Sequence, residues 1–161
     1  MHHPTQRGRH MRDVTALLER PQRAEVIGTV LRNNPGMDEA TAGRIVDEAV
    51  KFVAAVAGAS RPLAQSRVVD EGRHALILHT RTCRQLCERL GAFVHHVPET
   101  PDPQRRDPEA LTRTRQRIAE AGFPVDDALW LVPTDQSIPV AASCQHSDDS
   151  GPIVTIPKPK G

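Results

Sequence analysis

The scarcity of aromatic side chains is the feature that most constrains how this chain can fold. Its 161 residues include three Phe, one Trp and no Tyr. A buried core must therefore be built mainly from Leu, Val, Ile and Ala. Such a core suits packed helices better than a β-sandwich, because strands favour β-branched and aromatic residues. We expect an all-α fold. The four aromatic residues are Phe52, Phe93, Phe123 and Trp130.

Helical periodicity and helix-end signals recur along the chain. Apolar residues follow an i, i+1, i+4, i+5 pattern within 26–31 and recur at helical spacing within 45–56. Capping residues precede the periodic segments, and Gly58 and Gly91 follow two of them. Gly72 marks either a break or a close helix contact. The sequence predicts a small bundle of four to five helices, from segments at 13–18, 22–32, 38–58, 66–90 and 107–121, with a further helical turn at 126–130.

The polar ends of the chain set the expected domain boundaries. Residues 1–12 are polar and basic, and the chain from 133 onward is polar and contains several prolines. Prolines also interrupt 92–106, which we expect to be a loop. We therefore expect a disordered N-terminus at 1–12, one helical domain at 13–132 and a flexible tail at 133–161.

Charge and hydropathy limit the classes of partner and location. The chain has 21 basic and 20 acidic residues, so its net charge of +1 gives no field that would attract nucleic acid. We expect no signal peptide, because residues 1–11 are polar and basic with no apolar stretch after them, and no apolar run approaches the roughly 20 residues of a membrane span. Three cysteines, an odd number, argue against a secreted disulfide framework. We expect a soluble cytoplasmic protein that binds neither nucleic acid nor membrane.

The segment expected as one helix from Ser66 to Leu90 carries the candidate chemistry. His79, Cys83 and Cys87 are spaced i, i+4, i+8, so they would share one face of that helix. Imidazole and thiolate ligands favour zinc, with copper(I) second. His95 and His96, just beyond the helix, could add ligands. His74 lies off the shared face, and Asp70 one turn earlier could accept a hydrogen bond from it and fix its tautomer. The candidate metal ligands are thus His74, His79, Cys83, Cys87, His95 and His96.

Three other interpretations remain open. Buried cysteines and histidines also occur in cores without any metal. The protein could instead be an enzyme in which Cys87 or Cys83 is the nucleophile and His79, His95 or His96 the base. A third possibility is an interaction module whose proline-containing end, 151–160, docks on a protein partner. No glycine-rich phosphate loop is present, so we expect no nucleotide cofactor.

The same segment and the loop after it carry a series of short motifs, which read Val69-Asp70, Arg73-His74, Ile77-Leu78-His79-Thr80, Cys87 and His95-His96-Val97-Pro98. In their order, these motifs resemble the bacterial branch of the glycine-rich domain-containing protein-like family. The resemblance extends more weakly from Asn34 to Trp130 and implies a helical fold; an accessory role in a biosynthetic pathway is compatible with it. The chain departs at Arg73 and Cys83, where the family has Trp and Tyr, and only Cys144-Gln-His146 remains of a Cys- and His-rich tail. Within these motifs, Asp70, His74, His79, Cys87, His95 and His96 match the pattern of the family.

Overall fold

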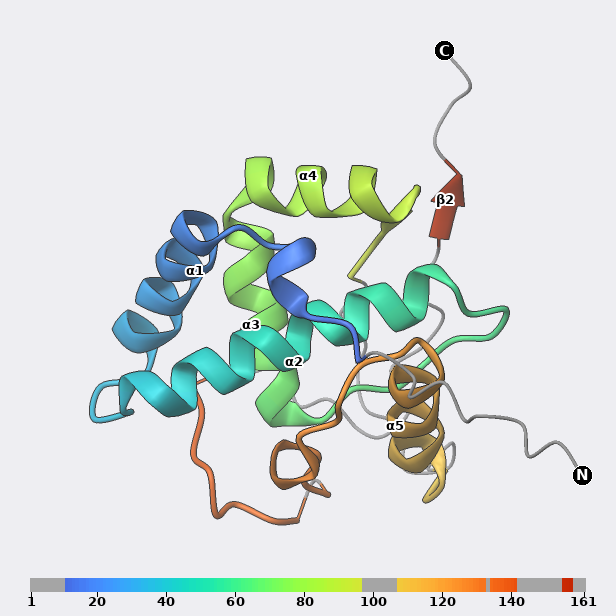
Figure 1. Ribbon diagram of the computed structural model, residues 1–161. Helices are drawn as coiled ribbons and strands as arrows, with labels where there is room; N and C mark the ends of the chain where they lie inside the picture. Colours follow the sequence, from blue (N-terminus) through green and yellow to red (C-terminus); the bar gives the residue numbers. More distant parts are fainter. Residues whose placement is uncertain (1–10, 97–106, 133, 142–154, 158–161) are drawn as a thin grey trace, which may run out of the picture.

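The computed structural model describes residues 11–96, 107–132, 134–141 and 155–157, and this part of the chain is largely helical (Figure 1). The predicted all-α fold is confirmed. Residues 1–10, 97–106, 133, 142–154 and 158–161, which include much of the expected disordered ends, lie outside the described residues. The helices are α1 (Arg20–Asn33), α2 (Glu39–Ala57), α3 (Arg67–Leu78), α4 (Thr80–Leu90) and α5 (Ala110–Glu120), with 3₁₀ turns η1 (Val14–Ala16) and η3 (Asp127–Leu129).

Helix α2 forms the centre of the bundle, with α1, α3 and α5 packed against it (Figure 1). Apolar residues occur on most sides of α2, so most of its side chains are buried, including those of Phe52 and Val53. Gly72 lies where α3 crosses α2: a Cβ there would be 2.7 Å from the carbonyl oxygen of Ile45 and 2.8 Å from Cβ of Ala49. Of the two predictions for Gly72, the close helix contact is therefore confirmed.

Several helix ends follow the signals in the sequence. Asp38 accepts a hydrogen bond from the Thr41 N–H at 2.8 Å, and Ser66 accepts one from Val69 N–H at 3.1 Å. Gly91 ends α4 with φ of 75°, a left-handed conformation that favours glycine. Asp107 accepts from the Glu109 N–H at 2.9 Å just before α5. These local hydrogen bonds satisfy N–H groups that have no partner within their helix.

The prediction of one helix from Ser66 to Leu90 is wrong. At His79 the backbone dihedral angles are not helical, with φ −90° and ψ 70°. Helix α4 therefore runs in a different direction, across the end of α3 (Figure 1). A continuous helix would carry its last turns away from the bundle. The bend brings Cys83, Leu86 and Cys87 back onto the core, at the expense of an exposed Leu78.

A short sheet occupies part of the segment expected to be a loop. Strand β1 (Ala92–Val94) pairs antiparallel with β2 (Thr155–Pro157), placing Phe93 opposite Ile156. Residues 155–157, within the expected flexible tail, thus pair with β1. Contacts with the helices also continue past residue 132, since the Arg67 guanidinium donates to the carbonyl of Ile138 at 3.0 Å. These pairings join segments far apart in the chain, which helical periodicity does not reveal.

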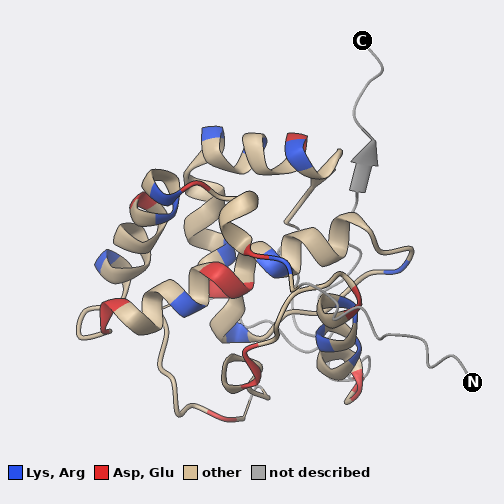
Figure 2. Cartoon of the chain, in the orientation of Figure 1, with Lys and Arg blue, Asp and Glu red and all other residues tan. Residues whose placement is uncertain are grey.

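Charged residues are interspersed along the helices in the view of Figure 2, as the near-zero net charge suggests. Among the acidic residues, Glu48 of α2 is fully buried, as is Asp70 of α3. The Glu48 carboxylate accepts hydrogen bonds from Lys51 Nζ at 3.0 Å, Trp130 Nε1 at 3.0 Å and the Asp126 N–H at 3.2 Å. Glu48 thus anchors the segment around η3 to the central helix.

Candidate metal centre

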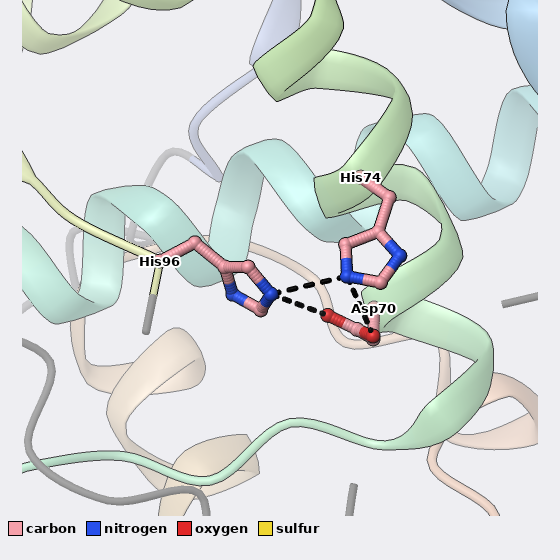
Figure 3. A group of neighbouring side chains, drawn as sticks. All are labelled: Asp70, His74 and His96. Carbon is pink, nitrogen blue, oxygen red and sulfur yellow. Dashed lines mark hydrogen bonds and ion pairs between the residues drawn. The ribbon is translucent and has the colours of Figure 1, made fainter. Parts of the chain in front are cut away.

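Three metal-ligating side chains converge beside α3 (Figure 3). Asp70 and His74 lie one turn apart on α3, and His96 follows strand β1. Nε2 of His74 lies 3.0 Å from Nε2 of His96 and 3.2 Å from Oδ2 of Asp70. Nε2 of His96 lies 3.7 Å from Oδ1 of Asp70. Within the described ranges, this is the one group of three or more such residues whose ligand atoms all lie within 4.8 Å of one another.

The site is partly sheltered from solvent. The side chain of Asp70 is fully buried, while those of His96 and His74 are 12% and 25% exposed. Gln65 Nε2 donates to Oδ1 of Asp70 at 2.7 Å and lies 3.5 Å from Nδ1 of His96. The amide therefore orients the carboxylate and sits against the outer nitrogen of one imidazole. Nothing in the sequence pattern had singled out Gln65.

Local structure explains why these residues meet. The Ser66 cap fixes the start of α3, so that Asp70 and His74 point to one side of the helix. The left-handed turn at Gly91 then reverses the chain after α4 and begins β1, in which Val94 is buried. His96 comes two residues after Val94, and an extended segment turns alternate side chains to the same side. Helix packing and a chain reversal thus bring together residues 22 positions apart.

The predicted contact between Asp70 and His74 is present, but its geometry differs from the predicted one. We expected Asp70 to hold the His74 nitrogen that faces away from a metal. Instead, the same atom, Nε2, faces both Asp70 and His96. Asp70 is therefore placed to be a ligand itself.

The other predicted ligands lie elsewhere. Nε2 of His79 lies 2.8 Å from Oγ1 of Thr29 on α1, and its Nδ1 lies 4.0 Å from Oε2 of Glu25. The His95 ring packs on Phe93, with ring centroids 4.7 Å apart. Cys83 and Cys87 are free thiols that share a hydrogen bond on the buried face of α4. Because the chain bends at His79, the predicted stripe of His79, Cys83 and Cys87 does not run along one helix.

Comparison with protein-family models, curated proteins and solved structures gives no significant match. The described helices include none that is both long and apolar enough to cross a bilayer. The functional argument therefore depends on the site itself.

Proposed function

We propose that this protein binds one zinc ion through Asp70, His74 and His96. The observation that carries the proposal is the convergence of two imidazole nitrogens and one buried carboxylate on a common point (Figure 3). A metal ion at this point would balance the charge of the buried carboxylate and accept the lone pairs of both rings.

The spacing of the ligand atoms favours a tetrahedral ion. Zinc bonds of about 2.0–2.1 Å at tetrahedral angles separate ligand atoms by roughly 3.3–3.4 Å. The two imidazole nitrogens are 3.0 Å apart, and each lies near a different oxygen of the carboxylate, Oδ2 at 3.2 Å from His74 and Oδ1 at 3.7 Å from His96. These distances are close to the tetrahedral value, and one oxygen would have to turn toward both nitrogens. Binding would therefore need only small side-chain adjustments.

The chemistry of the ligands supports zinc over copper(I). Copper(I) favours thiolate and thioether ligands, and the converging group contains neither. Two nitrogens and one oxygen match the ligands of zinc sites with three protein ligands, in which water or substrate fills the fourth position. Such a site can act as a Lewis acid or activate a bound water. It also fits a metal-dependent role that is accessory to another enzyme.

The proposal also covers the family to which the chain belongs and its location in the cell. We propose that the chain is a divergent bacterial member of the glycine-rich domain-containing protein-like family. The support is that Asp70, His74 and His96 all belong to the motifs that carry the resemblance. A cytoplasmic location is supported by the free thiols of Cys83 and Cys87.

The test is a zinc titration in competition with a chromophoric chelator. Wild-type protein should bind one zinc per chain. Losing even an outer partner of a zinc ligand costs about 10–100-fold in affinity, so Asp70→Asn and His96→Gln should each cost at least that much. His95→Gln, one position away, is the matched control and should leave affinity within about threefold. Absence of zinc binding by the wild type, or equal losses for His95→Gln and His96→Gln, would overturn the proposal.

A further inference from the structure

Arg73 is a buried cation that lacks hydrogen-bonding partners. Its side chain is 1% exposed, the largest of the fully buried side chains. None of its three guanidinium nitrogens has a hydrogen-bond partner among the described residues. Its guanidinium carbon lies 5.9 Å from the centroid of the Phe52 ring, a cation–π contact. Since arginine stays protonated in proteins, such burial is costly unless an anion lies close by.

Two thiols on the facing helix can provide that anion. Cys83 and Cys87 lie one turn apart on α4, both buried and both free. The ionisable groups close enough for a negative charge to act on Arg73 are Cys83, Asp70 and Cys87. Of these, Asp70 is engaged with Gln65 and His74 at the metal centre. The two thiols take no part in that centre.

Cys87 is the better placed of the two to carry the charge. Its sulfur accepts a hydrogen bond from the Cys83 thiol and another from the Val94 N–H of β1. The Cys83 hydrogen bond, the Val94 N–H and the Arg73 charge together lower the pKa of Cys87, and outweigh the opposing effect of burial. The same hydrogen bond, with burial, raises the pKa of Cys83.

We propose that Cys87 is held as a thiolate with Arg73 as its counter-ion, and that it is the residue at which hydroperoxides oxidise this protein. The thiolate attacks one peroxide oxygen, so an S–O bond forms as the O–O bond breaks. Sulfur loses two electrons to the peroxide, the second oxygen leaves as hydroxide from hydrogen peroxide or as alkoxide from an organic hydroperoxide, and Cys87 becomes a sulfenic acid. Arg73 is then a positioning residue that favours the ionised sulfur.

Solvent exposure alone predicts the opposite order of reactivity. Cys83 is 9% exposed and Cys87 is 4% exposed, so access favours Cys83. The thiolate proposal favours Cys87. This opposition makes a comparison of the two thiols decisive.

The test compares two single-thiol proteins with hydrogen peroxide at neutral pH. Cys83→Ser with Cys144→Ser leaves only Cys87 and keeps a hydroxyl donor at position 83. Cys87→Ser with Cys144→Ser leaves only Cys83. Thiol loss and dimedone-trapped sulfenic acid, located by mass spectrometry, give the two rates. An ordinary thiol is only a few per cent ionised at neutral pH, so Cys87 should react at least about tenfold faster.

Arg73 is tested in the Cys87-only protein. Arg73→Met keeps the shape but removes the charge, and should slow oxidation about tenfold. Arg73→Lys keeps the charge and should restore most of the rate. Circular dichroism checks folding. If Arg73→Met fails to fold, the pH profile decides: the Cys87 rate should level off below the ordinary thiol pKa of about 8.5, while the Cys83 rate still rises above it. Equal rates for the two thiols, or a folded Arg73→Met protein that reacts like its parent, would overturn the proposal.

Discussion

Replacing Gly72 with alanine tests how closely α2 and α3 pack. The added methyl group would lie 2.7 Å from the Ile45 carbonyl oxygen, 2.8 Å from Ala49 Cβ and 3.1 Å from Ile45 Cγ2. The optimal separation of non-bonded carbon atoms is about 3.5–4.0 Å, so the two helices must move apart by several tenths of an ångström. Two of the three obstacles are backbone or Cβ atoms, which cannot rotate away.

The expected magnitude follows from two opposing effects. Overpacking of this kind costs about 1–3 kcal/mol. Alanine recovers up to about 1 kcal/mol through its higher helix propensity. With the full recovery, we expect Gly72→Ala to lower the free energy of unfolding by up to roughly 2 kcal/mol.

Gly28 of α1 provides the matched control. Its added methyl group would meet only the end of the Arg32 side chain, at 3.3 Å, and that side chain can move. Gly28→Ala should therefore stabilise the protein by about 0.5–1 kcal/mol. Urea denaturation followed by far-UV circular dichroism measures both variants. If Gly72→Ala proved as stable as Gly28→Ala, the close crossing of α2 and α3 would be refuted.

Three further changes have outcomes set by the structure. Glu48→Gln should lower the free energy of unfolding in urea melts by about 3 kcal/mol, because it leaves Lys51 buried without its anion. The control is Asp47→Asn, which breaks the partly exposed pair with Arg23 and should cost under about 1 kcal/mol. Equal losses of stability in the two variants would contradict this prediction. Truncation after Val132 removes the Ile138 carbonyl that accepts a hydrogen bond from Arg67, and it should lower the free energy of unfolding by about 1 kcal/mol or more. An unchanged melt would show that this hydrogen bond does not stabilise the fold. The pKa of Cys87 is lowered in the fold, so its stabilisation is present above the unfolded pKa of about 8.5 and is lost as pH falls through the folded value. Urea melts between pH 6 and 9 should therefore show the advantage of wild type over Cys87→Ser growing with pH, and a flat or shrinking advantage would count against a lowered pKa.

Local signals predicted most of the helices because their causes are local. Asp38, Ser66 and Gly91 act within a turn of their own position, as capping hydrogen bonds and a left-handed glycine. The Asp70–His74 contact belongs to the same class, since residues four apart on a helix are neighbours. Such features can be read from a short window of sequence.

The break at His79 and the approach of His96 have non-local causes. No proline or glycine interrupts the chain at His79, and the bend places Leu86 and Cys87 in the buried interior. His96 reaches Asp70 through the reversal at Gly91 and the placement of β1. For the same reason, the predicted ligand stripe of His79, Cys83 and Cys87 depended on a straight helix that does not form.

Cobalt(II) substitution tests the proposed metal centre most directly, because cobalt reports both the geometry and the atoms that bind it. A tetrahedral site of two imidazoles and one carboxylate should give intense visible d–d bands and no thiolate-to-cobalt charge-transfer band in the near ultraviolet. The bands should disappear in His96→Gln and persist in Cys87→Ser. A charge-transfer band that disappears with Cys87→Ser would place the metal on the thiols and contradict the Asp70, His74 and His96 site.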